Sequence, residues 1–164
     1  MKGEGDMQTI RRVGVAVLAA AGMASASAQE PFDACDVFTQ VEAQKVLGAH
    51  AEPEPVNPKV KKPRVIPTCT WWGSRDGKAI SAAVTFRFGR NEAEVQRAFD
   101  DEKLKFQTKP MLIGDASAFW SAKQGVLQLL KGRTWVLISV GGTKPAERDG
   151  DAAKRIAEAI VKKL

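Results

Sequence analysis

Apolar positions recur along the chain with two different spacings, and these spacings predict where helices and strands form. Val41, Val46 and Leu47 make an apolar stripe at helical spacing behind a Thr39–Glu42 capping box, which predicts a short helix over residues 40–47. From residue 68 to residue 88 the chain is rich in β-branched and aromatic residues and alternates apolar with polar positions. An Asp76-Gly77 pair interrupts this stretch, so we predict a β-hairpin there.

The second half of the chain repeats this alternation of helix and strand patterns. Asn91 is a good helix cap, and the helix after it should continue to about residue 106, before the break at Pro110. Three strands are expected at 116–121, 126–131 and 134–140, followed by a last helix from near residue 145 to residue 164. The predicted order is α-β-β-α-β-β-β-α, and the short hairpin connections favour a mainly antiparallel sheet. We therefore expect an α+β fold with the helices packed on one face of the sheet.

The N-terminus has the layout of a secretory signal peptide. Arg11 and Arg12 precede an apolar run over residues 13–23, and small residues follow it. The run is shorter than the roughly 20 apolar residues that cross a bilayer. We predict that residues 1–28 are removed after Ala28, with Ala26 as the alternative site. Residues 29–164 would then be a single domain, periplasmic or secreted, without a membrane span.

The chain has two cysteines, Cys35 and Cys69. An oxidising compartment favours a disulfide between them, and two free buried thiols are the alternative. Two cysteines with one histidine fall short of a four-ligand zinc site.

Residues 51–67 are dense in proline and basic residues. Such proline density is incompatible with a helix or a central strand, so this segment should be an extended basic arm. Its cations are Lys59, Lys61, Lys62 and Arg64.

Several short motifs together resemble a known family. They are Cys35-Asp36-Val37-Phe38-Thr39, Cys69-Thr70-Trp71, Gly114-Asp115-Ala116 and Phe119-Trp120. This pattern is similar to a family of small exported domains of unknown function, best known from actinobacterial lipoproteins. The resemblance implies a Cys35–Cys69 bridge and an α/β sandwich akin to the Mog1/PsbP-like shape. It implies no catalytic residues, and this chain lacks the lipidated cysteine of those lipoproteins.

The residue content is poor in groups that perform catalysis. The chain has one histidine, His50, and no tyrosine, and both cysteines are expected to be paired. In the Asp100-Asp101-Glu102 run adjacent side chains diverge around the helix axis, which disfavours a paired-carboxylate site. Asp115 follows Gly114, a pattern more typical of a turn than of a catalytic acid. We predict that the protein is not an enzyme, and we expect no cofactor and no metal site.

Binding is the function that the remaining features favour. Trp72 and Trp135 lie on predicted strands, where an uncovered sheet face would leave an apolar surface, while the four cations of the arm would attract an acidic partner. We expect a non-catalytic interaction module, monomeric or homodimeric, that binds an envelope protein or an anionic surface polymer. An inhibitor or immunity protein is one form of it, and nucleic acid is not an expected partner. The alternative is a carrier that holds a small apolar ligand between sheet and helices.

Overall fold

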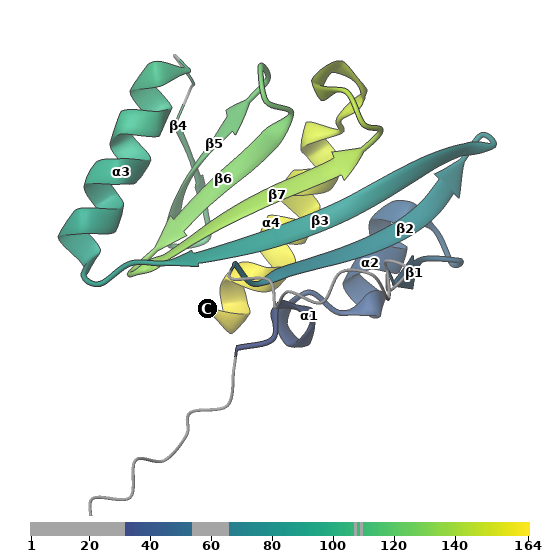
Figure 1. The fold of residues 1–164 in the computed structure, drawn as a ribbon, viewed down its shortest axis with the longest axis horizontal. Coiled ribbons are helices and arrows are strands. Elements are labelled where there is room, and N and C mark those ends of the chain that lie inside the picture. Colours follow the sequence, from purple (N-terminus) through teal and green to yellow (C-terminus); the bar gives the residue numbers. More distant parts are fainter. Residues whose placement is uncertain (1–31, 54–65, 107, 109) are drawn as a thin grey trace, which may run out of the picture. The chain divides into compact units, whose positions relative to one another are not determined.

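The computed structural model describes residues 32–53, 66–106, 108 and 110–164, and these fall within one compact unit, Pro31–Leu164. A sheet of seven antiparallel strands runs through this unit in the order β1-β2-β3-β7-β6-β5-β4 (Figure 1). The strands are β1 (Glu52–Pro53), β2 (Thr68–Arg75), β3 (Lys78–Phe88), β4 (Pro110–Ile113), β5 (Ala116–Ser121), β6 (Val126–Lys131) and β7 (Thr134–Gly141). The α+β class and the antiparallel sheet predicted from the sequence are confirmed.

The sequence predicts the long strands well because their turns carry recognisable residues. Asp76 (φ 53°) and Gly77 (φ 74°) form the two-residue connection of the β2–β3 hairpin, where positive φ matches the twist of the strands. The later strands form the expected meander, β5-β6-β7. β7 then pairs with β3 at the centre of the sheet, which joins the hairpin to the meander.

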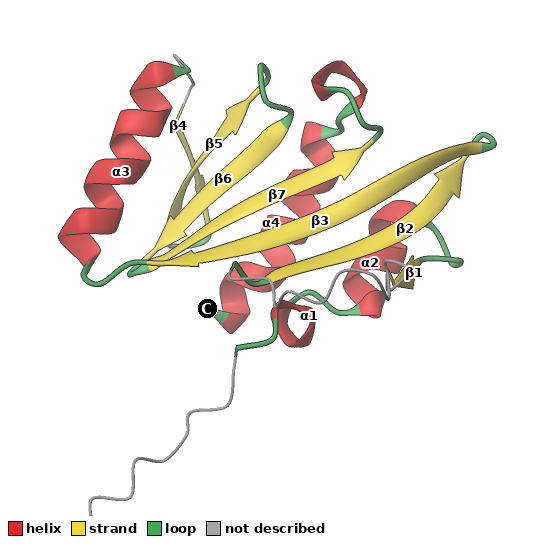
Figure 2. Cartoon of the chain, in the orientation of Figure 1, coloured by secondary structure: helices red, strands yellow, loops and turns green. Residues whose placement is uncertain are grey.

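Three helices cover one face of the sheet. They are α1 (Ala34–Val37), α2 (Gln40–Leu47) and α4 (Gly150–Ile160), and Figure 2 shows α4 crossing behind the strands. Their apolar side chains pack with alternate residues of the strands into the main core, which includes Phe38, Val84 and Ile138, all fully buried. The Glu42 carboxylate accepts a hydrogen bond from the Thr39 N–H (3.0 Å), so the predicted capping box of α2 is present.

The remaining long helix, α3 (Glu92–Lys105), packs on the opposite face of the sheet. Val95 and Phe99 from α3 form a second, smaller core with Phe119, Leu130 and Trp135. The expectation that all helices lie on one face is therefore wrong for α3. The physical reason is that β5, β6 and β7 carry apolar residues on both faces, and α3 buries the second set.

The structure also adds short elements that the predicted order lacks. α1, β1 and β4 are new, and a 3₁₀ turn, η1 (Pro145–Glu147), precedes α4. The last helix begins at Gly150, not near Pro145, because the Asp149 side chain caps it by accepting from the Ala152 N–H (2.9 Å). Another 3₁₀ turn, η2 (Val161–Lys163), continues it toward the C-terminus.

A disulfide joins Cys35 in α1 to Cys69 in β2, with a Cα–Cα distance of 5.0 Å. The predicted pairing is confirmed. The bridge links residues 34 positions apart and fastens the first helical segment to the sheet, while the Trp71 indole N–H donates to the Phe38 carbonyl (3.0 Å) beside it. In the loop-entropy account a ring of this size stabilises the fold by about 4 kcal/mol.

Candidate functional site

Half of the face that carries α3 is made of small, uncharged side chains. Side chains at alternate positions of β2, β3 and β7 share this face, because paired residues of neighbouring strands point the same way. We call this surface the uncharged face, and its members are Thr68, Thr70, Trp72, Ser74, Ala79, Ser81, Ala83, Thr85, Leu137 and Ser139. Arg87 closes one end of it, and Glu52 in β1 lies beside Trp72 at the edge.

Among the described helices, only α3 packs on this side of the sheet, and it covers the other end. α3 packs on β5, β6 and the start of β7, and the other three helices lie on the opposite face. In the part of the chain that the structure describes, no helix packs on this face of β2 and β3. None of the ten members carries a charge, so another surface can approach this face closely without burying an uncompensated charge.

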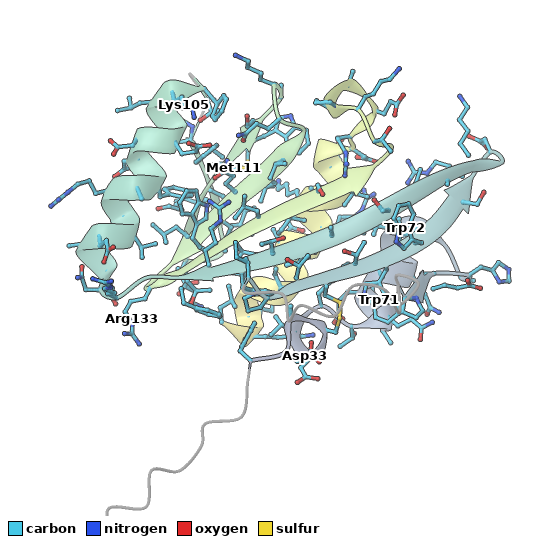
Figure 3. The ribbon with its side chains drawn as sticks, in the orientation of Figure 1. Asp33, Trp71, Trp72, Lys105, Met111 and Arg133 are labelled. Atoms are coloured by element: carbon cyan, nitrogen blue, oxygen red, sulfur yellow. A yellow bond between two sulfur atoms is a disulfide. The ribbon has the colours of Figure 1, made fainter. Side chains whose placement is uncertain are left out.

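Trp72 is the one large side chain on β2 that belongs to the uncharged face. It lies opposite Ser81 of β3 and is half-buried, whereas Trp71 points to the other face and packs against the main core (both are labelled in Figure 3). The Trp72 indole N–H is buried and has no hydrogen-bond partner within the described ranges. A buried donor without an acceptor costs free energy.

Trp135 lies on the same face but beneath α3, and it is only 9% exposed. Its indole N–H donates to Gln128 Oε1 (3.0 Å), and its ring packs edge-on against Phe99 (6.0 Å between centroids). The Arg87 guanidinium lies 5.1 Å from the centre of the Trp135 ring. Trp135 is thus a packed core residue, and the structure does not bring it together with Trp72 in one accessible site.

The basic arm is only partly described. Ala51 is buried and Glu52–Pro53 form the edge strand β1, which pairs with Trp71 and Trp72. Lys59, Lys61, Lys62 and Arg64 lie outside the described residues, as does the predicted signal peptide, residues 1–28.

Of the uncharged face, only Trp72 is predicted from the sequence, and the small residues around it are not. The signal is readable in β3, where Ser81, Ala83 and Thr85 occupy the positions between the buried ones. The absence of a charge at all three positions is the feature that can be read from the sequence. Their neighbours on β2 and β7 cannot be assigned to one surface without the register of the sheet.

The pKa shifts of two carboxylates have structural causes. Burial raises the pKa of Glu42, but hydrogen bonds from Thr39 and Lys163 outweigh it and leave that pKa below the usual range. The Ala152 N–H holds the pKa of Asp149 low, and Arg75 adds to this. Both carboxylates cap helices and pair with cations, and these interactions stabilise the fold.

Two kinds of feature are absent from the described ranges. They contain no group of three or more His, Cys, Asp or Glu side chains placed to hold a metal ion. Nor do they contain a helix long and apolar enough to cross a membrane.

Comparison of the chain with models of protein families, with curated proteins and with solved structures finds no match in any of the three. The resemblance to small exported domains of unknown function therefore stays a prediction.

Proposed function

We propose that this chain is a non-catalytic, exported interaction module whose partner is another protein of the cell envelope. The observation that carries the proposal is the uncharged face, an open half of a sheet that presents Trp72 among small side chains. Interface cores are depleted of charged residues, and tryptophan is enriched among the residues that dominate binding.

The chemistry of the partner follows from the two parts of the proposed surface. The uncharged face complements an apolar patch, because a charge buried there would lose its hydration without gaining a counter-ion. The four arm cations, Lys59, Lys61, Lys62 and Arg64, complement acidic residues beside that patch. We therefore expect a partner with an apolar surface bordered by carboxylates, such as an envelope enzyme that this module inhibits.

Export is the second component of the proposal. It is supported by the order of basic, apolar and small residues in the first 28 positions and by the Cys35–Cys69 disulfide, which oxidising compartments maintain. The intact mass of the exported protein should correspond to a chain that begins at Gln29. Retention of residues 1–28 would contradict this component.

Affinity capture from envelope extract tests the docking surface. The variant Ser81→Glu/Ala83→Glu places two charges in the centre of the uncharged face, and we expect it to lose the captured protein at every salt concentration. Ser117→Glu, at an exposed position of β5, is the matched control and should capture normally. Equal capture by both variants would refute the proposed face.

The same assay separates the arm from the face. Replacing Lys59, Lys61, Lys62 and Arg64 with Gln should weaken capture most at low salt, because screening already weakens the wild-type attraction at high salt. Recovery of a polysaccharide or other anionic polymer in place of a protein would identify the other partner class that the arm could serve and would contradict the proposal.

The alternative function, a carrier of a small apolar ligand, is less well supported. An open cavity of about 460 Å³ lies between the sheet and the start of α4, and Trp120 and Leu127 line it. Its rim carries Arg148, Asp151 and Lys154, and these charges disfavour a wholly apolar occupant.

A further inference from the structure

The cavity at the start of α4 lies on the opposite side of the sheet from the uncharged face, and the proposed function does not use it. Its floor consists of Met111 from β4, Trp120 from β5 and Leu127 from β6, three apolar side chains on the same face of the sheet. Leu127 is buried, whereas Trp120 and Met111 are half-buried; Met111 is labelled in Figure 3. The volume of about 460 Å³ is in the range of small-molecule sites.

Backbone packing fixes the position of the Trp120 ring. Gly150, the first residue of α4, lies against the indole so closely that a Cβ at this position would come within 3.3 Å of the ring atoms. One part of the ring is therefore covered by backbone, and the cavity borders Trp120 beside it. A ring held in this way offers a rigid flat surface to an apolar group.

Arg148 supplies the charged side of the cavity. Its aliphatic stem packs over Gly125, where a Cβ would sit 2.4 Å from Arg148 Cγ, so the stem is confined. The guanidinium makes no ion pair and no hydrogen bond within the described residues. The side chain is half-buried, and burial lowers the pKa of Arg148 despite the nearby charge of Glu147.

Glu147 interacts favourably with this cation, but no carboxylate forms an ion pair with Arg148 within the described residues. Asp149 already accepts from the Ala152 N–H (2.9 Å) and pairs with Arg75 (3.4 Å), so its charge is compensated elsewhere. Lys154 adds a second positive charge to the lining and has only a 3.9 Å contact to Glu158. A partly desolvated guanidinium without an ion-pair partner gains free energy when an anion binds beside it.

We propose that this cavity binds a small monocarboxylate with an apolar body, the carboxylate pairing with Arg148 and the body resting on Trp120 and Met111. Asp151 is exposed at the rim, where it disfavours a second negative charge on the ligand. The site therefore selects monoanions over dianions and over neutral molecules of the same shape.

An NMR titration of the purified protein with phenylacetate tests this site, with phenylacetamide as the neutral probe of the same shape. We expect the Trp120 indole N–H signal, assigned with Trp120→Phe, to shift with phenylacetate, and phenylacetate to bind about tenfold more tightly than phenylacetamide. Phenylmalonate, a dianion, should bind more weakly than phenylacetate, and Asp151→Asn should reduce that difference.

Two variants distinguish a specific pair between Arg148 and the ligand carboxylate from a general effect of positive charge. Arg148→Gln should remove the preference for phenylacetate over phenylacetamide, whereas Lys162→Gln, which removes an exposed cation on η2, should retain it. Equal affinity for the two probes in the wild type would overturn the proposal, as would an Arg148→Gln protein that keeps the preference. If Arg148→Gln does not fold, Arg148→Lys replaces it as the variant. The wild-type comparison of phenylacetate with phenylacetamide then tests the proposal.

Discussion

At the scale of single residues, close backbone packing at glycines holds the region before α4 in place. The backbone carbonyl of Glu147 approaches Gly141 so closely that a Cβ at Gly141 would be 2.3 Å from this oxygen, and Gly141 has φ 120°. Gly142 is similarly close to the Glu147 side chain. The Gly141-Gly142 pair thus allows η1 to fold back onto the end of β7, where Asp149 N–H donates to the Val140 carbonyl (2.8 Å).

Gly141→Ala should therefore destabilise the fold strongly, by about 3 kcal/mol or more, because it combines a backbone clash with an unfavourable φ. Gly77→Ala is the matched control, since Gly77 also has positive φ (74°) but has nothing within 4 Å of an added Cβ. It should cost about 1 kcal/mol. Urea denaturation followed by tryptophan fluorescence measures both, and similar losses for the two variants would contradict this account of Gly141.

At the scale of elements, the distribution of helices over the two faces decides which part of the sheet remains available. α3 covers β5, β6 and the start of β7 through Val95 and Phe99, whereas α1, α2 and α4 occupy the other face. The uncharged face exists because α3 stops short of β2 and β3.

The packing of α3 can be tested with two substitutions on the same helix. Phe99 is 1% exposed and contacts Phe119 and Trp135, so Phe99→Ala should lower the free energy of unfolding by about 3–5 kcal/mol. Leu104 is 73% exposed, and Leu104→Ala should change the free energy of unfolding by about 0.5 kcal/mol or less. Thermal or urea unfolding distinguishes them, and a tolerated Phe99→Ala would mean that α3 does not form the second core.

The sequence predicts the elements of this fold better than their assembly. Local signals suffice for the Asp76-Gly77 hairpin, the Asn91 cap of α3 and the strands β5 to β7, because turn and cap residues act over a few positions. The side of the sheet on which α3 packs depends on contacts between distant segments, and a stripe of apolar residues does not specify it. β1 and β4 are too short to produce a periodic pattern.

The uncharged face could be predicted from the sequence only in part. Trp72 was identifiable as a strand residue of large area, whereas the role of Trp135 was not, because its burial depends on α3. The cavity lined by Trp120 and Arg148 had no sequence signal at all, since its residues come from three strands and the start of α4.

At the scale of the whole molecule, carboxylates that cap helices or pair with cations make stability depend on pH. The Ala152 N–H and Arg75 lower the pKa of Asp149 in the folded state. The stabilisation from a lowered pKa is complete above the pKa of the unfolded chain, about 4, and is lost as the pH falls through the folded value.

Asp149→Asn isolates this contribution, because asparagine keeps a capping oxygen but carries no titrating charge. We expect the variant to be less stable than the wild type at pH 7 and the difference to shrink between about pH 4 and pH 2. Urea denaturation across this range measures it. A difference that stays constant down to pH 2 would show that the charge of Asp149 does not stabilise the fold.

The claim on which the proposed function depends is that a partner protein covers the uncharged face. Photo-crosslinking in cells that export the protein tests it most directly, with benzoylphenylalanine placed at position 83 in the centre of that face and at position 158 on the exposed side of α4 as the control. The account predicts one discrete crosslinked protein from position 83 and none from position 158. Crosslinking from position 158 alone, or from position 83 only to residues of the same chain, would contradict it.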